Sequence, residues 1–481
     1  MTNITGNSDT IAAIATGMTQ AGIGIIRISG PDVFEVADKI FCTGSGKKIS
    51  EMSSNTINHG YIFDNNRKTD EVLASVMRAP HSYTGEDTVE INCHGGLFLL
   101  NRVLQIILEN GARLAEPGEF TKRAFLNGRM DLSEAEAVMD LISSHNKFAA
   151  DNSMKQLSGN LRSMIIDIRK QIIYESAYIE SALDDPEHFD LTGYPENLKN
   201  KTNKFLSIIN SMIDSYENGR IMKEGIRTAI LGKPNAGKSS LLNFLSGHES
   251  AIVTDIAGTT RDAIEESVRV GSLQLNLIDT AGIRNTDDVV EKIGVEKALE
   301  ISEDADLVLY VIDSSVPLDE NDHRIINIIK DKNTIILFNK SDLEQAVSES
   351  DIQSLIYGNE KGLNEDINNF INNNHNIPIL RISLKDGRGV DELEKLLERK
   401  FISEGNKLND EIIVTNLRHF QELKSAKESL LNVEKSIDDG MEEDFFTVDL
   451  MDAYRHLGMI IGEETGEDLV NEIFSKFCMG K

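Results

Sequence analysis

One segment near the middle of the chain has the composition and spacing of a phosphate-binding loop. Residues 232–239 are Gly-Lys-Pro-Asn-Ala-Gly-Lys-Ser. Glycines at these positions allow close approach of the backbone to a phosphate, and the backbone amides then point toward its oxygens. Lys238 is expected to reach the β- and γ-phosphates of a nucleotide, and the Ser239 hydroxyl is expected to bind Mg²⁺. The segment therefore predicts a nucleoside triphosphate as the ligand.

Two tetrads further along the chain indicate that this nucleotide is GTP. Asp279-Thr-Ala-Gly282 and Asn339-Lys-Ser-Asp342 each follow an apolar run. At a strand end, the Asp279 carboxylate suits contact with Mg²⁺ through water, and the Gly282 amide suits the γ-phosphate. The Asp342 carboxylate can accept two hydrogen bonds, from N1 and from the exocyclic amine of guanine. Adenine lacks this pair of donors, so the second tetrad selects GTP over ATP.

The strand and helix patterns around these motifs predict a Ras-like α/β domain with a P-loop. A glycine-rich loop between a strand and a helix N-terminus is the usual setting of a phosphate site, and here a helix pattern begins at Ser240. Ser383-Leu-Lys385 follows the last strand and fits a loop that supports guanine, with Leu384 where Ala is usual. The strand patterns that precede the motifs cover residues 227–231, 275–278, 334–338 and 378–382.

The composition narrows the class of protein further. The length of 481 residues predicts roughly two to four domains, and 40% hydrophobic residues favour a folded chain. The formal charge of −30 argues against broad nonspecific binding of nucleic acid. Residues 1–130 carry 12 Lys and Arg against 14 Asp and Glu, a net charge of −2, so −28 lies in the rest of the chain. If RNA is bound, we expect a partner to supply much of the positive surface.

No segment of the sequence indicates secretion or a membrane. The first residues, Met1-Thr-Asn-Ile-Thr-Gly6, contain no basic stretch followed by an apolar core. No apolar run approaches the roughly 20 residues that a membrane span requires. Cys42, Cys93 and Cys478 are too few and too scattered for a disulfide framework. We therefore expect a cytoplasmic protein that does not enter a membrane.

The first part of the chain predicts an α+β domain over residues 1–125. The pattern of residues 22–30 is that of a strand flanked by glycines, and residues 88–93 alternate as a second strand. Residues 99–110 have the pattern of an amphipathic helix that Gly111 closes.

Helical patterns lie on both sides of the nucleotide domain, which covers residues 221–402. The first helical part covers residues 126–220, with apolar residues at helical spacing over 132–142 and an interruption near 186–195. The second covers residues 403–481. We expect the two parts to pack together as one discontinuous helical domain into which the nucleotide domain is inserted. Two separate helical domains are the alternative.

Outside the GTP motifs, the chain resembles a known family over its full length, the tRNA-modification GTPases called MnmE or TrmE. The residues that carry the resemblance are Gly24-Ile-Ile-Arg-Ile-Ser-Gly30, Tyr83-Thr-Gly-Glu-Asp87, Cys93-His-Gly-Gly96, Pro117 to Asn127, and Phe474-Ser-Lys-Phe-Cys-Met-Gly-Lys481. The last stretch has the family's Cys-x-Gly-Lys ending. GTPases of ribosome assembly share the GTP motifs but lack these flanking stretches.

The resemblance implies a cytoplasmic enzyme that works with a flavoprotein partner of the MnmG type, which holds FAD. Together the two proteins would add a carboxymethylaminomethyl or aminomethyl group at C5 of the wobble uridine, position 34, of certain tRNAs. The one-carbon unit would come from 5-formyl- or methylene-tetrahydrofolate. The resemblance also implies a homodimer through an N-terminal folate-binding domain, a heterotetramer with the flavoprotein, and pairing of the nucleotide domains across the dimer.

The resemblance further implies a potassium site beside the phosphate loop. Asn235 matches the family's potassium ligand, and Thr254, Ile256 and Thr259 would complete the shell, the first two through backbone oxygens. A monovalent cation there offsets negative charge that develops on the phosphates, as an arginine finger does in other GTPases. An Asn that only stabilises the loop is the alternative.

Residues 254–262 match switch I of the family, in which Thr260 would be the second protein ligand of Mg²⁺. Ile283 stands where Ras-like proteins carry a water-orienting Gln, so the attacking water must be held differently. Glu291 matches the family's acidic residue, which acts through a bridging water, and a solvated helix residue is the alternative. The residues expected to contact GTP are Asn235, Ala236, Gly237, Lys238, Ser239, Ser240, Thr254, Asp255, Ile256, Ala257, Gly258, Thr259, Thr260, Asp279, Thr280, Ala281, Gly282, Asn339, Lys340, Asp342, Ser383, Leu384 and Lys385.

Four charged residues match the folate-binding positions of the family: Arg27, Glu90, Arg129 and Lys481. Basic groups suit the glutamate carboxylates of folate, and a carboxylate such as Glu90 suits the ring NH and amine of the pterin. The family also uses Lys at the position of Arg129, so the charge is kept while the geometry differs. Apart from the resemblance, each of the four would be an ordinary surface charge.

Cys478 is a candidate catalytic residue. The basic neighbours Lys476 and Lys481 favour the thiolate form, which is the nucleophile. A partly buried thiol on a terminal helix is the alternative.

Two other functions are consistent with the GTP motifs alone. One is a ribosome-assembly GTPase that acts as a binding switch, and the other is a folate-binding scaffold whose GTPase activity is incidental. The flanking stretches favour the tRNA-modifying enzyme over both.

Overall fold

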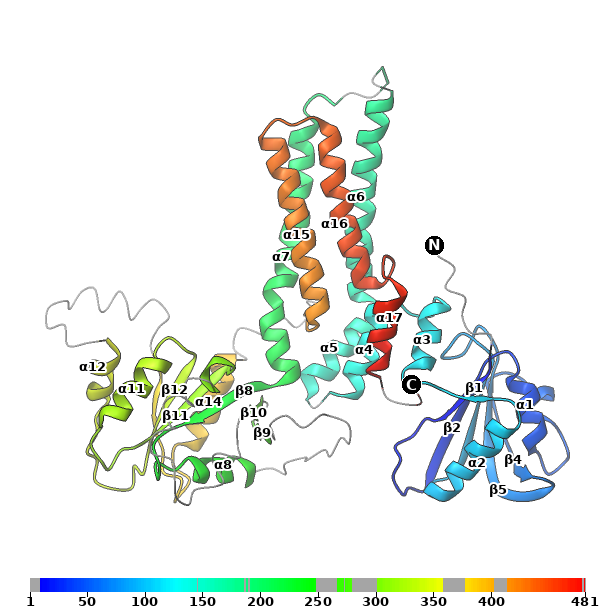
Figure 1. The fold of residues 1–481 in the computed structure, drawn as a ribbon, viewed down its shortest axis with the longest axis horizontal. Helices are drawn as coiled ribbons and strands as arrows, with labels where there is room; N and C mark the ends of the chain where they lie inside the picture. Colours follow the sequence, from blue (N-terminus) through cyan, green and yellow to red (C-terminus); the bar gives the residue numbers. More distant parts are fainter. Residues whose placement is uncertain are drawn as a thin grey trace. The chain divides into compact units, whose positions relative to one another are not determined.

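The computed structural model divides the chain into two compact units (Figure 1). The first unit combines Met1–Asp214 with Asn416–Lys481, and the second is Ser215–Thr415. The structure describes residues 9–144, 146–185, 187–188, 191–247, 266–271, 273–278, 301–357, 377–401, 413–477 and 480.

The N-terminal part of the first unit is a seven-stranded sheet with the order β3-β4-β5-β6-β2-β1-β7. Neighbouring strands are antiparallel except for β1 and β7, which are parallel. The strands predicted over 22–30 and 88–93 are confirmed as β2 and β6. The strands are β1 Ile11–Ile14, β2 Ile23–Ser29, β3 Phe41–Cys42, β4 Thr56–Asp64, β5 Arg67–Met77, β6 Thr88–His94 and β7 Arg113–Leu114.

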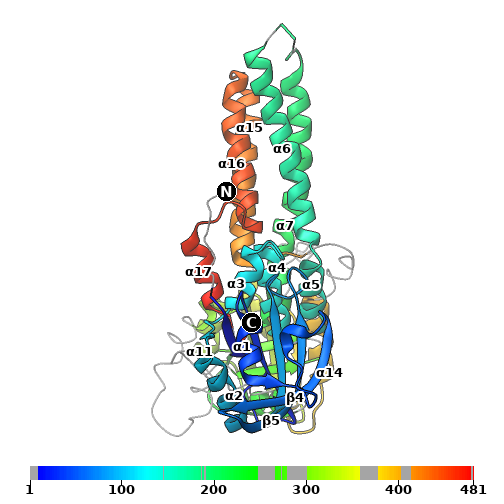
Figure 2. The same ribbon diagram turned by 90° about the vertical axis from the view of Figure 1, so that its right-hand side faces the viewer.

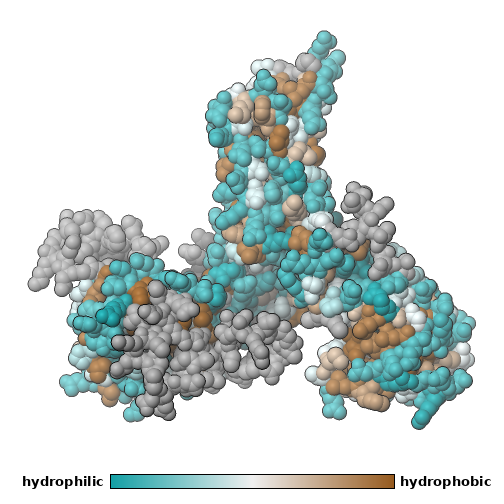
Figure 3. Space-filling view, in the orientation of Figure 1, coloured by the Kyte–Doolittle hydropathy of each residue, from teal (hydrophilic) through white to brown (hydrophobic). Residues whose placement is uncertain are grey.

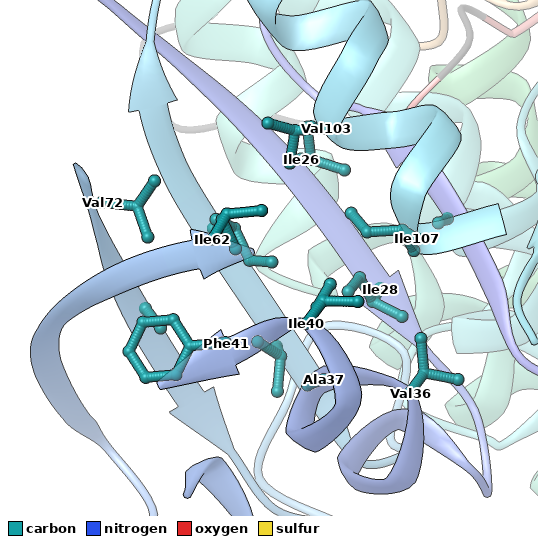
Figure 4. Packing of buried hydrophobic residues seen from close by; sticks show 14 of the residues in the cluster. Ile26, Ile28, Val36, Ala37, Ile40, Phe41, Ile62, Val72, Val103 and Ile107 are labelled. Carbon is teal, nitrogen blue, oxygen red and sulfur yellow. The ribbon is translucent and has the colours of Figure 1, made fainter. Parts of the chain in front are cut away.

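Two helices, α1 (Val33–Ile40) and α2 (Leu97–Glu109), pack on one face of this sheet. Alternate residues of β2 point to that face, so that Ile26 and Ile28 join a core with Val103 and Ile107 of α2 (Figure 4). The helix predicted over 99–110 is confirmed with a start two residues earlier. A shorter helix, α3 (Glu119–Leu126), contributes Phe120 to a second cluster with Ile11 and Ala13 of β1.

Long helices make up the rest of the first unit. The helix predicted over 132–142 is confirmed as α4, which begins with a capping box: Asp131 accepts from the Glu134 amide, and Glu134 accepts from the Asp131 amide. Helix α6 ends at Asp184, and Pro195 stands in the first turn of α7, where proline is tolerated. The helices are α4 Leu132–Ile142, α5 Lys147–Leu157, α6 Asn160–Asp184, α7 Tyr194–Glu224, α15 Leu417–Asp438, α16 Glu443–Ile461 and α17 Glu467–Ser475. The part of α7 from Ser215 on belongs to the second unit.

Helices from the two ends of the chain lie against each other within the first unit. α16 runs beside both α15 and α6 in two perpendicular views (Figures 1 and 2). The Arg169 side chain on α6 is buried, its Nε donates to the Tyr454 carbonyl at 3.1 Å, and its guanidinium lies 3.9 Å from the Tyr454 ring centroid. The visible faces of these helices are mostly hydrophilic, with scattered hydrophobic residues (Figure 3). Among the described residues, no helix combines the length and apolar character needed to cross a bilayer.

The second unit is built on a six-stranded sheet with the order β13-β12-β11-β8-β10-β9. All neighbours are parallel except β9 and β10, and apolar clusters cover both faces. Ligands of such sheets bind beyond the carboxyl ends of the strands. The described elements are β8 Ile226–Leu231, α8 Lys238–Gly247, β9 Glu266–Val270, β10 Leu273–Leu277, β11 Leu307–Asp313, α11 Glu320–Ile329, β12 Thr334–Asn339, α12 Glu349–Tyr357, β13 Ile379–Arg381 and α14 Val390–Phe401.

Candidate guanine nucleotide site

The phosphate loop connects β8 to α8 and has a backbone that only certain residues can adopt. Gly232 has φ 152°, Asn235 has φ 62° and Gly237 has φ 108°. A Cβ at Gly232 would lie 2.3 Å from the Val311 carbonyl oxygen, and one at Gly237 would lie 2.1 Å from Nδ2 of Asn339. Both glycines are therefore required by close contacts as well as by their backbone angles.

Lys238 is the first residue of α8, and its ammonium group turns back over the loop. Its Nζ donates to the carbonyl oxygens of Gly232 and Lys233, each at 2.8 Å. Burial lowers the pKa of Lys238. The ammonium is thus held beside the amides of the loop and the helix N-terminus, where phosphate groups bind in loops of this type.

Asn339 ties the phosphate loop to the two loops expected to hold guanine. Its side chain is buried, and Nδ2 donates to the Ala236 carbonyl at 2.8 Å. Oδ1 accepts from the Leu384 amide at 3.4 Å. A single amide side chain therefore joins residues that are far apart in sequence.

The other residues of these two loops are also placed by specific contacts. Asp342 is exposed, and its Oδ1 accepts from the Ser383 hydroxyl at 3.0 Å, which orients the carboxylate. Lys340 has φ 61°, and its Nζ lies 2.5 Å from Oδ2 of Asp313. Burial alone would raise the pKa of Asp313, but the hydrogen bonds from Lys340 and Ser315, together with the charge of Lys340, lower it overall. Lys385 is exposed at the edge of the same group.

The described part of the site thus contains the phosphate loop and the residues expected at guanine. Ser239 and Ser240 stand in the first turn of α8, and Asn235 is exposed. The remaining expected residues lie outside the described residues, namely Thr254, Asp255, Ile256, Ala257, Gly258, Thr259, Thr260, Asp279, Thr280, Ala281, Gly282, Glu291, Cys478 and Lys481.

In the N-terminal domain, the sheet register brings Arg27 and Glu90 together. They are direct neighbours on β2 and β6, and the Arg27 Nε donates to Oε1 of Glu90 at 2.8 Å. The guanidinium lies 5.1 Å from the ring centroid of Tyr83 and 5.6 Å from that of Phe120. Its Nη1 is buried and has no hydrogen-bond partner among the described residues. A buried donor of this kind suits an acceptor group of a ligand.

The other two expected folate residues are not brought into this pair. Arg129 is exposed in the turn after α3, and Lys481 lies outside the described residues. The chain end nevertheless reaches the sheet, because a Cβ at Gly480 would lie 2.2 Å from the carbonyl oxygen of Ile14 on β1. Cys93 is buried on β6, and burial is the main reason that the pKa of its thiol is raised to about 12, so it is not a nucleophile at neutral pH.

Several residues that organise these sites were missed from the sequence. Asp313 forms an ion pair with Lys340, and the Tyr83 ring lies against the guanidinium of Arg27. The buried Asp322 pairs with Lys233 at 2.6 Å. The sequence offered one signal for Asp313: it directly follows an apolar run, residues 307–312, just as Asp279 follows the apolar run 275–278. Tyr83 and Phe120 lie in stretches that carry the family resemblance, but their contacts with Arg27 were not predicted. Asp322 gave no signal, because its partners lie on other elements.

Comparison with known proteins agrees with the resemblance seen in the sequence. The family model described as "MnmE helical domain" matches residues 132–478, and the model described as "GTP-binding protein TrmE N-terminus" matches residues 10–129. The chain belongs to the MnmE family. Family membership, together with the nucleotide-binding loops, identifies a GTP-hydrolysing enzyme.

The similarity to individual members of the MnmE family extends over whole chains. A protein of Lachnoclostridium phytofermentans named "tRNA modification GTPase MnmE" is 53% identical over 475 residues, which are 98% of this chain and 100% of that protein. Proteins of the same name from Acetivibrio thermocellus and Clostridioides difficile are 46% and 45% identical, each over 98% of this chain and 99% of the relative. Among solved structures, the G domain of the T. maritima FeoB iron transporter has a TM-score of 0.23 at 25% identity, with 37% of this chain and 98% of that chain covered.

Proposed function

We propose that this MnmE-family GTPase uses GTP hydrolysis to drive modification of C5 of the wobble uridine of certain tRNAs. The observation that carries the proposal is 53% identity over 98% of the chain to a protein named as a tRNA modification GTPase. In this proposal, a flavoprotein partner of the MnmG type forms a heterotetramer with a homodimer of this chain. The group added is carboxymethylaminomethyl or aminomethyl, and the enzyme acts in the cytoplasm.

The nucleotide half of the proposal assigns a task to each described loop. Lys238 exchanges the carbonyls of Gly232 and Lys233 for the β- and γ-phosphates, which is a small movement because the ammonium already lies over the loop. Asp342 accepts from guanine, with Ser383 fixing its orientation. Asn339 fixes the position of the phosphate loop relative to the guanine loops through its hydrogen bonds to Ala236 and Leu384.

The metal ligands proposed for this site come from the phosphate loop and from residues outside the described ranges. Ser239 and Thr260 would hold Mg²⁺, with Asp279 acting through water, and the oxygen donors suit this hard cation. Asn235, Thr254, Ile256 and Thr259 would hold K⁺, and Asn235 is an exposed residue whose side-chain amide offers an oxygen ligand. The bound cations supply positive charge at the phosphates. Glu291 would orient the attacking water through a second water.

The one-carbon half of the proposal rests on the N-terminal domain. The orphaned Nη1 of Arg27 provides a buried donor for tetrahydrofolate, and Glu90 holds the guanidinium in place. Arg129 and Lys481 would bind the glutamate carboxylates of folate. Cys478 remains a candidate catalytic thiol, because the basic neighbours Lys476 and Lys481 favour its thiolate form. We also propose that the nucleotide domain is inserted into a discontinuous helical domain, which the α6–α16 contacts support.

Mass analysis of wobble uridines tests this function directly. A strain lacking the protein is complemented either with the wild-type chain or with a Lys238→Ala variant. We expect the modified uridine to be absent from the deletion strain, restored by the wild-type chain and not restored by the variant. Normal modification in the deletion strain would refute the function. Full restoration by Lys238→Ala would show that hydrolysis is incidental, and hydrolysis unchanged when Na⁺ replaces K⁺ would refute the potassium site.

A further inference from the structure

A buried carboxylate outside the expected site contacts the phosphate loop. Asp322 lies in the first turn of α11, and 1% of its side chain is exposed. Its Oδ2 lies 2.6 Å from Nζ of Lys233, the second residue of the loop. Its Oδ1 accepts from the hydroxyl of Tyr310, a fully buried residue of β11, at 2.8 Å. The loop is therefore linked through Lys233 to both α11 and β11.

Lys233 connects Asp322 to the residue expected to bind the nucleotide phosphates, Lys238. Its carbonyl oxygen is one of the two that accept from Lys238, the residue expected at the phosphates. The preceding residue, Gly232, packs so closely on β11 that a Cβ there would meet the Val311 carbonyl at 2.3 Å. The first arm of the loop, Gly232 and Lys233, is thus held by the Lys233 side chain and by the close packing of the Gly232 backbone. The other arm is held at Ala236, whose carbonyl accepts from Asn339.

The needs of α11 alone do not account for a buried charge at Asp322. The N-cap of this helix is Asp319, whose Oδ1 accepts from the amides of Asn321 and Asp322. Asp322 completes the capping box by accepting from the Asp319 amide at 2.9 Å, a role that exposed acidic side chains commonly fill. Burying a carboxylate is costly unless a cation and hydrogen bonds compensate for the lost hydration. Here the compensating cation belongs to the phosphate loop.

We propose that Asp322 is a positioning residue for GTP, which acts by holding Lys233 and hence the first arm of the phosphate loop. It does not touch the nucleotide. By holding Lys233, it keeps the loop amides and the Lys233 carbonyl that accepts from Lys238 in the geometry that binds phosphate. Asp319 gives secondary support, because its exposed carboxylate lies 3.1 Å from the Lys233 ammonium. The pair holds the loop before and after hydrolysis, so it contributes to binding more than to the chemical step.

Steady-state hydrolysis and nucleotide binding by the full chain test this role. In Asp322→Asn and in Lys233→Met, we expect the KM for GTP and the Kd for a fluorescent GDP analogue to rise about tenfold, with kcat at saturating GTP within about twofold of wild type. The double variant should be no worse than either single variant, since the two residues act through one contact. Lys233→Arg, which keeps the charge, should restore most of the affinity.

Glu320→Gln is the matched control, because Glu320 stands in the same turn of α11 with the same charge but points to solvent, 93% exposed. We expect its KM and Kd to be unchanged. If Asp322 only stabilised the fold, its variants would lower the melting temperature without changing KM. An unchanged KM in soluble Lys233→Met, additive losses in the double variant, or an equal loss in Glu320→Gln would each overturn the proposal. Should Asp322→Asn not fold, Lys233→Met and Lys233→Arg decide the question.

Discussion

In the nucleotide site, each motif carries much of its own geometry, whereas the charged pairs of the first unit depend on distant parts of the chain. Lys238 bonds to carbonyls only six and five residues away. Arg27 meets Glu90 across a separation of 63 residues, and Arg418 meets Glu136 across 282. Local backbone conformation dominates the first case, while strand register and helix packing dominate the second.

The contacts of Glu136 with Arg418 and His419 show how the first unit depends on residues that are far apart in sequence. Glu136 on α4 is buried, and its carboxylate accepts from Nη2 of Arg418 at 2.7 Å and pairs with Nε2 of His419 at 2.7 Å. Arg418 also donates to the carbonyls of Met459 and Ile460 at the end of α16. Three helices from both ends of the chain therefore meet at one carboxylate. The comparison teaches that the residues expected to select GTP lie within short motifs, while the cohesion of the first unit depends on contacts between distant segments.

The strongest test of the nucleotide site is Gly237→Ala. The new Cβ would lie 2.1 Å from Nδ2 of Asn339 at a backbone angle that favours glycine, so the Asn339–Ala236 hydrogen bond would be lost. We expect GTP affinity to fall by about 1,000-fold, or about 4 kcal/mol. Gly440→Ala is the control: it has φ 65° but no neighbour within 4 Å, so it should leave GTP binding unchanged. Wild-type affinity in Gly237→Ala would show that the loop tolerates a different backbone.

The strongest test of the non-local half is the pH dependence of Glu136. Burial alone would raise its pKa, but the charge and hydrogen bond of His419, followed by those of Arg418, lower it from 4.5 to about 2. A lowered pKa means that the folded state binds fewer protons than the unfolded state. The stabilisation is therefore fully present above about pH 4.5 and is lost as the pH falls toward 2. At neutral pH, this shift corresponds to about 3 kcal/mol.

Melting temperatures of wild type and Glu136→Gln from pH 6 to pH 3 check this prediction. We expect a large difference at pH 6 that narrows as the pH falls. The control is Glu35→Gln, which removes an exposed pair with Lys39 at 2.9 Å and should cost less than about 0.5 kcal/mol at every pH. A difference for Glu136→Gln that stays constant with pH would contradict the assignment.

Asp342→Asn tests whether guanine recognition is as local as the phosphate loop. The amide group replaces one acceptor oxygen by a donor, so one of the two hydrogen bonds from guanine becomes a repulsion. We expect GTP affinity to fall by about 50-fold, or about 2.3 kcal/mol. Affinity for xanthosine triphosphate should rise, because xanthine presents a carbonyl where guanine has its amine. Asp331→Asn is the control, because Asp331 is exposed and precedes the amino end of β12, whereas Asp342 follows its carboxyl end. Unchanged GTP affinity in Asp342→Asn would remove this residue from the site.

The smallest expected effect belongs to Glu90→Gln in the N-terminal domain. The side chains of Arg27 and Glu90 are 15% and 23% exposed, so their ion pair is screened less than a surface pair. We expect the free energy of unfolding to fall by about 1 to 2 kcal/mol, measured by denaturant titration. Glu71→Gln on β5 removes an exposed contact with His59 and should cost less than about 0.5 kcal/mol. Equal costs for the two variants would show that register adds nothing to the strength of the Arg27 pair.

Much of the fold was predictable, because the patterns that indicate elements are local. The helix over 132–142 has its predicted bounds, since Asp131 and Glu134 form the capping box within one turn. The strand predicted over 334–338 extends to Asn339, because Asn339 continues the pairing of β12 with Asp313 of β11. Neither the sheet order nor the pairing partner of any strand was predicted. These depend on which distant segments bury the most apolar surface together.

The sequence by itself determined the ligand, since the spacing of Gly232, Gly237 and Lys238 and the carboxylate of Asp342 carry their chemistry in short segments. It also determined the family, through stretches at both ends of the chain. Only the tertiary structure decided that Asn339 ties Ala236 to Leu384, that Asp322 holds Lys233, and that Glu136 meets Arg418 and His419. The physical reason is that a buried polar group needs a partner wherever the chain provides one, and that partner can lie at any separation in sequence.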